Sequence, residues 1–366
     1  MTEQIRTSTR DLEELRDRVS AWLRGQVGSP VTVSELSRPS GNGLSSETLF
    51  FTASWGRERT RCVARLAPAA EAVPIFPSYD LRAQFEIMRL AREKAGVPVP
   101  RALWLEPDPG PLGSPFFVME REDGDVPQDL TPYTFEGWLR DARPQDRRRL
   151  QDATVGVLAA LHDAPFTGDD LAVLTPGGPN RAGAGGGSAS GLRAHVDEQR
   201  AYYEWAHGSL RVPLLERAFD WLEAHWPDDP GPDVLSWGDA RIGNVIYRDF
   251  RPVAVLDWEM AALGPRELDL AWMIFLHRFF QNITESLGLP GLPDFMRRDD
   301  VCRTYRDLTG YEPRDMGFYE MYAALRHGVI MARVWRRRIH FGEQAMPGDP
   351  DDLVLHRATI EELLRG

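Results

Sequence analysis

The chain has 366 residues, with 43 Lys+Arg against 55 Asp+Glu and a formal net charge of −12. Its length and its 42% apolar fraction indicate a globular protein of about two domains with a large core. The acidic balance argues against nucleic acid as a partner, because binding to the phosphate backbone requires clustered positive charge. Basic clusters occur at 147–149 and 336–338, in helix-like stretches where a solvated face explains them.

The basic residues comprise one lysine, Lys94, and 42 arginines. Lys94 stands in the sequence Arg-Glu-Lys-Ala-Gly, which lacks the Gly-Lys-Ser/Thr of a phosphate-binding P-loop. A P-loop nucleotidase is therefore excluded. A Schiff-base enzyme is disfavoured, because it would have to use this one side chain.

The cysteine content and the apolar runs indicate the compartment. Cys62 and Cys302 lie 240 positions apart, which matches neither a disulfide framework nor a zinc site. The first twenty residues include acidic side chains, unlike a secretion signal, and no apolar run approaches the ~20 residues of a membrane span. These features predict a cytoplasmic protein with no membrane partner.

Residues 1–121 are predicted to form a β-rich lobe with a leading helix. Apolar residues at helical spacing predict helices over 11–24 and 81–95, the second of which ends at Gly96. A glycine turn is expected at 41–43. Short β-branched or alternating runs predict strands over 31–36, 48–54, 61–66, 102–106 and 115–121.

Residues 122–366 are predicted to form a second, mainly helical lobe. One β-hairpin interrupts the helices, with 244–247 pairing with 253–256 across the turn at 248–252. The glycine-rich run 177–191 contains no Gly-x-Gly-x-x-Gly after a strand and is interpreted as a surface loop. The predicted helices cover 145–162, 191–206, 213–226, 266–280 and 317–340.

The most informative segment is 236–244, which reads Ser-Trp-Gly-Asp-Ala-Arg-Ile-Gly-Asn and is followed by Asp257. Asn244 precedes the first strand of the predicted hairpin and Asp257 follows the second. Their side chains should therefore emerge at the same open end, with Asp239 in the loop that leads into it.

These three side chains can serve phosphoryl transfer. Oxygen ligands suit Mg²⁺, which keeps substrate phosphates in its coordination shell, so Asn244 and Asp257 are candidate metal ligands. Asp239 would then orient the attacking hydroxyl. Asp and Asn are also ordinary turn residues, but their joint spacing around an apolar hairpin favours the functional interpretation.

The segment resembles the catalytic loop of the aminoglycoside phosphotransferase and choline kinase-like enzymes, which have a bilobal protein-kinase-like α+β fold. Their loop reads His-Gly-Asp-x-x-x-x-Asn, and this chain matches it except that Trp237 replaces the histidine. Gly264-Pro265 and the sequence Asp-Leu-Ala at 269–271 look most similar to kinase domains fused to acyl-CoA dehydrogenases. The resemblance spans about residues 30–340. It implies ATP and Mg²⁺ as cofactors, Asp239 as the catalytic residue, and Asn244 and Asp257 as metal ligands.

The resemblance also implies a cation on the third strand and an acidic partner on the next helix. Arg65 occupies the first position, where a guanidinium can grip phosphate oxygens in place of lysine, unless it is a surface arginine. Glu86 is the expected partner, although Glu93 competes for that role. Arg241 is expected either to contact a phosphate or substrate anion or to lie on the surface.

Two further segments are expected to contact the nucleotide. The turn at 40–46 resembles the nucleotide-covering loop of the fold, in which Ser45 or Ser46 would donate hydrogen bonds, but a plain hairpin turn explains it equally well. The strand ending near 121 falls where these kinases place the linker between lobes. Met119, Glu120 and Glu122 are therefore candidate residues for the adenine site.

The leading hypothesis is an ATP-dependent kinase that phosphorylates a hydroxyl of a small molecule, with the oligomeric state left open. The acceptor is either aminoglycoside-like, which suits an acidic protein, or a hydroxyacyl-CoA or another metabolic alcohol. Trp237 supports a second hypothesis, a nucleotide-binding pseudokinase. Residues on two later helices are expected to line the acceptor site, although the aromatic ones among them could equally belong to the core. They are Tyr202, Tyr203, Glu204, Trp205, Tyr319, Tyr322 and Arg326.

Overall fold

The computed structural model describes residues 10–39, 46–68, 73–174, 191–208 and 210–365. The chain divides into two compact units, Met1–Arg92 with Val99–Asp123 and Glu93–Pro98 with Gly124–Gly366. The predicted α+β class is confirmed, because the strands of the large sheet all lie in the first unit and most helices in the second.

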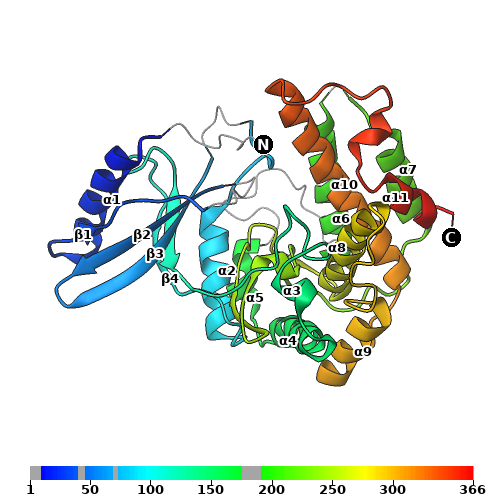
Figure 1. Ribbon diagram of the computed structural model, residues 1–366, viewed down its shortest axis with the longest axis horizontal. Coiled ribbons are helices and arrows are strands. Elements are labelled where there is room, and N and C mark those ends of the chain that lie inside the picture. Colours follow the sequence, from blue (N-terminus) through cyan, green and yellow to red (C-terminus); the bar gives the residue numbers. More distant parts are fainter. Residues whose placement is uncertain (1–9, 40–45, 69–72, 175–190, 209, 366) are drawn as a thin grey trace. The chain divides into compact units, whose positions relative to one another are not determined.

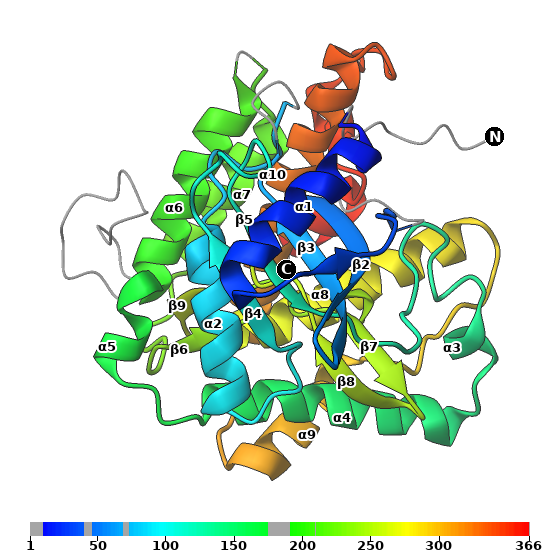
Figure 2. The ribbon, with the colours of Figure 1, turned by 90° about the vertical axis from the view of Figure 1, so that its left-hand side faces the viewer.

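The first unit is built on a five-stranded antiparallel sheet of order β1-β2-β3-β5-β4. Helix α1 lies over one face of this sheet, as Figure 2 shows, and buries Leu15, Val19 and Leu23 against it. Helix α2 packs on the opposite face, where Phe85 contacts Phe117 with ring centroids 6.2 Å apart. The elements are α1 (Leu12–Val27), β1 (Thr32–Val33), β2 (Glu47–Trp55), β3 (Glu58–Leu66), α2 (Leu81–Glu93), β4 (Ala102–Glu106) and β5 (Phe116–Glu120).

The predicted strand over 31–36 is shorter in the structure, where only Thr32–Val33 pairs as β1. Beyond Val33 the chain still follows β2, because the backbone N–H of Ser34 donates to Thr52 O at 2.9 Å. The Ser34 hydroxyl accepts in turn from the Thr52 N–H at 2.9 Å. The Ser34 side chain thus replaces one acceptor of the β1–β2 hydrogen-bond ladder, as serine hydroxyls often do by bonding to nearby backbone groups.

The second unit is mainly helical (Figure 1), and α10 packs against α8, α6 and α7. Its helices are α3 (Trp138–Asp141), α4 (Pro144–His162), α5 (Gly168–Leu171), α6 (Gly191–His207), α7 (Pro213–Ala224), α8 (Glu267–Ser286), α9 (Arg298–Thr309), α10 (Met316–His340) and α11 (Arg357–Leu363). Short 3₁₀ turns are η2 (Ala172–Leu174), η3 (Ile242–Asn244) and η4 (Pro350–Leu353). The strands form two pairs, β6 (Val234–Ser236) with β9 (Ala262–Gly264) and β7 (Val245–Arg248) with β8 (Arg251–Val255).

The β7–β8 hairpin closes at its far end through a two-residue turn. Asp249 and Phe250 have φ of 50° and 60°, and both positive values are those of the turn whose twist matches antiparallel strands. A bulky residue with positive φ is uncommon, and here the Phe250 ring packs on Trp138 with centroids 5.7 Å apart. The hairpin forms where the sequence predicts it, but its turn is shorter than the predicted 248–252, because Arg248 and Arg251 still pair in the two strands.

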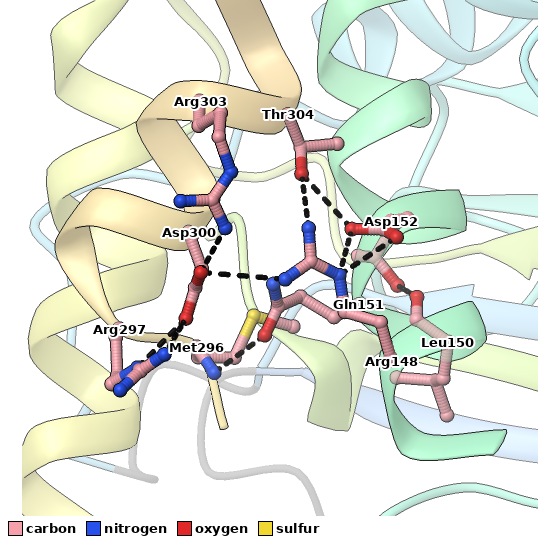
Figure 3. A network of polar contacts seen from close by, with 10 residues as sticks. Arg148, Leu150, Gln151, Asp152, Met296, Arg297, Asp300, Arg303 and Thr304 are labelled. Carbon is pink, nitrogen blue, oxygen red and sulfur yellow. Dashed lines mark hydrogen bonds and ion pairs between the residues drawn. The ribbon is translucent and has the colours of Figure 1, made fainter. Parts of the chain in front are cut away.

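Helix α9 has no counterpart among the predicted helices, because many of its residues are charged. Figure 3 shows what holds it to α4. The buried carboxylate of Asp300 accepts from Arg297 at 2.7 Å and also pairs with Arg303, while Arg148 of α4 lies 3.4 Å away. The Gln151 side chain accepts from the backbone N–H of Met296 at 2.7 Å.

Candidate functional site

The loop that carries the predicted base is fixed by one buried carboxylate, that of Asp269 on α8. Its two oxygens lie 2.7–3.1 Å from four partner groups, which are His162 Nε2, Ser236 Oγ and the backbone N–H groups of Trp237 and Gly238. Burial alone would raise the pKa of this carboxyl, but His162 and the other donors hold the pKa below its ordinary value. Asp269 therefore stays ionised and fixes the backbone immediately before Asp239.

Gly238 is required in this loop for two reasons. Its φ is +86°, and a Cβ at this position would lie 1.9 Å from Met260 O. The peptide is also held from its other side, because the Gly238 carbonyl accepts from Arg326 at 3.3 Å. Arg326 is 2% exposed and stacks over the Trp272 ring at 4.6 Å. The backbone is thus held on both sides of Gly238, through its N–H and through its C=O.

The carboxylate of Asp239 is held in one orientation by three donors. Trp272 Nε1 donates to Oδ1 at 2.7 Å. Asn244 Nδ2 and Arg241 Nε donate to Oδ2 at 2.6 and 3.1 Å. The side chain is 15% exposed, so an incoming hydroxyl can reach a carboxylate that is already oriented.

Trp237, which stands where the resembling family has a histidine, supports the loop from within the core. It is fully buried, and its indole Nε1–H donates to Leu256 O at 2.9 Å. Leu256 is the residue before Asp257, so this bond ties the loop before Asp239 to the segment of the predicted metal ligand. The departure from the family histidine therefore keeps a hydrogen-bond donor at this position.

The structure brings Asn244 and Asp257 together at the open end of the hairpin. The Leu256 N–H donates to Asn244 O at 2.8 Å, and the next residue is Asp257. Asp257 has φ +61°, a left-handed conformation that aspartate adopts more readily than most residues other than glycine.

A hard cation fits the donors at this end of the hairpin. The amide nitrogen of Asn244 already donates to Asp239, and among the described residues its Oδ1 accepts no hydrogen bond, so the amide oxygen is left for a ligand. No group of three or more His, Cys, Asp and Glu side chains suited to a metal ion occurs in the part of the chain that the structure describes. A cation here would therefore need oxygen ligands from a substrate as well, as Mg²⁺ does.

The predicted nucleotide-binding residues of the first unit lie in its sheet and on α2. Arg65 on β3 pairs in register with Phe117, so both side chains face α2. Glu86 accepts from Arg89 at 3.4 Å, one turn further along α2, and its pairing with Arg65 stays a prediction.

Met119 is buried in β5, whereas Glu120 forms an ion pair with Arg101 at 2.7 Å and Glu122 is half-buried after the strand. The Ser46 hydroxyl is buried and has no hydrogen-bond partner among the described residues. Ser45 and the glycine turn at 41–43 lie outside the described residues.

Most of the aromatic side chains expected near an acceptor are core residues. Tyr203, Tyr319 and Tyr322 are at most 2% exposed, and the Tyr322 hydroxyl donates to His195 O at 2.9 Å. Tyr202 and Trp205 stack on each other on α6, with ring centroids 5.9 Å apart. On α8 and α10, Trp272 and Arg326 contact the loop, through Asp239 Oδ1 and Gly238 O.

Sequence reasoning missed the roles of Asp269 and Trp272 in this site. Asp269 lies inside the densest apolar run of the chain, and a carboxylate there must be satisfied by buried donors, which is the signal that could have revealed it. Trp272 lies in the same run and looks like an ordinary core residue. The single lysine, Lys94, pairs with Asp170 at 2.6 Å within the second unit.

The comparisons with known proteins agree with this geometry. The model of the phosphotransferase enzyme family matches residues 38–297, which is more than half of the chain. The chain belongs to the phosphotransferase enzyme family. The predicted membership in a family of phosphotransferases is thereby confirmed.

This phosphotransferase is 25% identical over 251 residues to acyl-CoA dehydrogenase family member 11 of Homo sapiens, covering 66% of the chain and 29% of the relative. It spans about a third of the length of the acyl-CoA dehydrogenase relatives that it matches.

Solved structures show that the phosphotransferase has the kinase-like fold expected from its sequence. A putative aminoglycoside phosphotransferase from Ralstonia eutropha has a TM-score of 0.64 at 21% identity, with 95% of this chain and 96% of that chain covered. A mutant of aminoglycoside phosphotransferase APH(4)-Ia in complex with ADP and hygromycin B has a TM-score of 0.57 at 17% identity, with 95% and 98% covered. In the described ranges of the phosphotransferase, none of the helices has the length and apolar character of a membrane span.

Proposed function

We propose that this chain transfers the γ-phosphoryl group of ATP to a hydroxyl group of a small molecule, with Asp239 as the catalytic residue. The observation that carries the proposal is the Asp239 carboxylate itself. Three donors fix its orientation, and the first of the two candidate metal ligands, Asn244, is one of those donors. Positioning and electrostatic stabilisation supply most of the catalysis in this chemistry.

In the proposed reaction the Asp239 carboxylate accepts a hydrogen bond from the acceptor hydroxyl and orients its oxygen toward the γ-phosphorus. A bond forms between that oxygen and the phosphorus, and the bond from the phosphorus to the β–γ bridging oxygen breaks. The hydroxyl proton passes to Asp239, and ADP leaves with the electron pair of the broken bond. Trp272, Arg241 and Asn244 keep the carboxylate in place during this step.

Asn244 and Asp257 are the residues that would hold Mg²⁺. Asn244 would offer its amide oxygen, since its amide nitrogen donates to Asp239, and Asp257 would offer its carboxylate. The ion supplies neutralisation of the phosphate charge that develops in phosphoryl transfer. In the first unit, Arg65 is proposed to bind phosphate oxygens, and Ser46, Met119, Glu120 and Glu122 remain candidates for contacts to the nucleotide. The protein of similar fold in complex with ADP supports ATP as the donor.

Two acceptor classes are supported by different relatives. A protein of similar fold is bound to hygromycin B, which favours a hydroxylated aminoglycoside-like acceptor. The relatives named as acyl-CoA dehydrogenases favour a hydroxylated acyl thioester such as a hydroxyacyl-CoA. Of these two, we propose the aminoglycoside-like class first, because the net charge of −12 favours cationic ligands in general. A cytoplasmic location is part of the same proposal.

The test is release of ADP from ATP and Mg²⁺ in the presence of single acceptors from a panel of aminoglycosides, hydroxyacyl-CoA thioesters and simple alcohols. Wild type is expected to turn over at least one class, and Asp239→Asn is expected to lose roughly 10²-fold or more in kcat. Asp163→Asn is the matched control, because that carboxylate is exposed and pairs with Arg266.

Two outcomes would contradict the proposal. Equal turnover by wild type and Asp239→Asn would remove Asp239 from the chemistry. ATP binding without turnover of any acceptor would favour the pseudokinase.

A further inference from the structure

Arg241 bridges two carboxylates in the second unit. Its Nε donates to Asp239 Oδ2 at 3.1 Å, and its Nη1 pairs with Asp129 Oδ2. Burial disfavours the charged guanidinium, but the two carboxylates raise the pKa of Arg241 above its ordinary value. Arg241 is therefore a partly buried, paired residue rather than the surface residue that the sequence also allowed, and its contact with a phosphate or substrate anion stays a prediction.

The surroundings of this bridge strengthen it. Asp129 lies in the segment between β5 and α3 and lines a cavity of about 10 Å³ with Tyr133, Met273 and Met296, enough for about one water. The two side chains keep part of their exposure, 24% for Arg241 and 35% for Asp129, and a partly buried ion pair is screened less than one on an open surface. Asp129 is thus the second carboxylate that holds the Arg241 guanidinium in place.

Gly243 leaves the space that the bridge occupies. A Cβ on Gly243 would lie 2.6 Å from Arg241 Nη1 and 2.7 Å from Asp129 Oδ1. The backbone of Gly243 is not in the left-handed region, so the need for glycine here is one of space. An added methyl group would have to displace the ends of both charged side chains.

We propose that Asp129 and Arg241 are a positioning pair that holds the Asp239 carboxylate in its reactive orientation, and that Gly243 makes room for this pair. The inference rests on the proposed role of Asp239. A planar guanidinium offers several donors in a fixed fork, so one Arg241 can bind both carboxylates at defined angles. Asp129 acts through Arg241 and has no contact with substrate in this proposal.

A spectroscopic test is independent of turnover. Trp272 donates its indole N–H to Asp239 Oδ1, so the ¹⁵N–¹H signal of that indole reports the position of the carboxylate. Trp237 donates its indole N–H to a backbone oxygen and is an internal control in the same region. The two signals are assigned by their loss in Trp272→Phe and Trp237→Phe.

Asp129→Asn is expected to shift the Trp272 indole signal and to leave the Trp237 signal in place. Gly243→Ala should give the same pattern with both charges retained. Gly317→Ala is its control, because a Cβ there would meet nothing within 4 Å. An unmoved Trp272 signal, or an equal shift of both tryptophans, would overturn the proposal.

The kinetic test uses ATP and Mg²⁺ with water as the acceptor. Asp129→Asn and Gly243→Ala are expected to lower kcat roughly 10- to 100-fold, with KM for ATP changed less than about twofold, because misplacement of a reacting group affects the chemical step. Arg241→Lys should resemble Asp129→Asn, since an ammonium lacks the planar fork. A rise in KM for ATP with unchanged kcat would overturn the positioning role and assign Arg241 to the nucleotide. Shifts of the Trp272 signal without turnover by wild type would instead leave the pair intact and contradict the proposed function.

Discussion

Asp269→Asn tests whether one buried carboxylate holds the loop that carries Asp239. The substitution keeps the size of the side chain but replaces one acceptor oxygen by an NH₂ group, which would face groups that now donate to the carboxylate. The surrounding groups are His162 Nε2, Ser236 Oγ and the N–H groups of Trp237 and Gly238, all within 3.1 Å. The amide offers a single oxygen to them, so at least two groups lose a charged acceptor.

The expected cost follows from this count. Each buried donor left without an acceptor costs about 1–3 kcal/mol, and loss of one partner of a buried charged pair costs about 3–5 kcal/mol. We therefore expect Asp269→Asn to lower the free energy of unfolding by about 3–5 kcal/mol, a large share of the about 5–15 kcal/mol of a typical protein. Asp163→Asn changes an exposed pair with Arg266 and should cost about 0–1 kcal/mol.

Urea unfolding of the full chain, followed by circular dichroism, measures both variants against wild type. Amide hydrogen exchange gives the local effect, since the N–H groups of Trp237 and Gly238 should exchange faster in Asp269→Asn than in Asp163→Asn. A loss of less than about 1 kcal/mol, with both amides still protected, would refute the role assigned to Asp269.

Three further predictions concern other parts of the molecule. Trp237→Phe keeps most of the buried ring but removes the donor to Leu256 O, so we expect a loss of about 1–3 kcal/mol in unfolding free energy and a lower kcat; kcat equal to wild type in steady-state assays would show that the N–H is dispensable. Arg65→Ala should raise KM for ATP about 10- to 100-fold and Arg65→Lys less, while Lys94→Ala should change it less than about twofold. If Lys94→Ala alone lost activity, the assignment of the phosphate contact to Arg65 would be wrong. Burial lowers the pKa of His277 and of His356 to about 4. As the pH falls below about 6.5, these histidines become protonated in the unfolded chain but stay neutral in the native state, which lowers the stability. The urea midpoint should therefore drop between pH 7 and 5. That slope should flatten in His356→Gln and persist when the exposed His340 is changed to Gln, and equal slopes in all three proteins would contradict the assignment.

The parts of the fold that the sequence predicts well are those set by local pattern. Periodic apolar residues define α1, α2, α4 and α10 to within a few positions, because an amphipathic helix must bury one face. The hairpin at 245–255 was predictable for a similar reason, and with it the proximity of Asn244 to Asp257.

The contacts that fix the site were less accessible to prediction. Asp269 binds backbone N–H groups some thirty residues earlier in the chain, and a backbone donor has no signature in the sequence. Asp129 lies in an irregular segment whose path depends on tertiary packing. Helix α9 was missed because charged residues interrupt its apolar pattern, and its buried face includes Asp300 and Thr304 beside Val301 and Tyr305.

The β7–β8 hairpin has a consequence for how this protein could change its acceptor over evolution. Asn244 and the residue before Asp257 are joined by a backbone hydrogen bond, so the spacing of these two candidate metal ligands depends on main-chain geometry. The turn at 249–250 lies at the opposite end of the two strands. Away from Asp269, Trp272 and Arg326, which hold the loop, the surrounding helices are free to diverge in sequence and to present new surfaces to an acceptor, while the spacing of Asn244 and Asp257 stays the same.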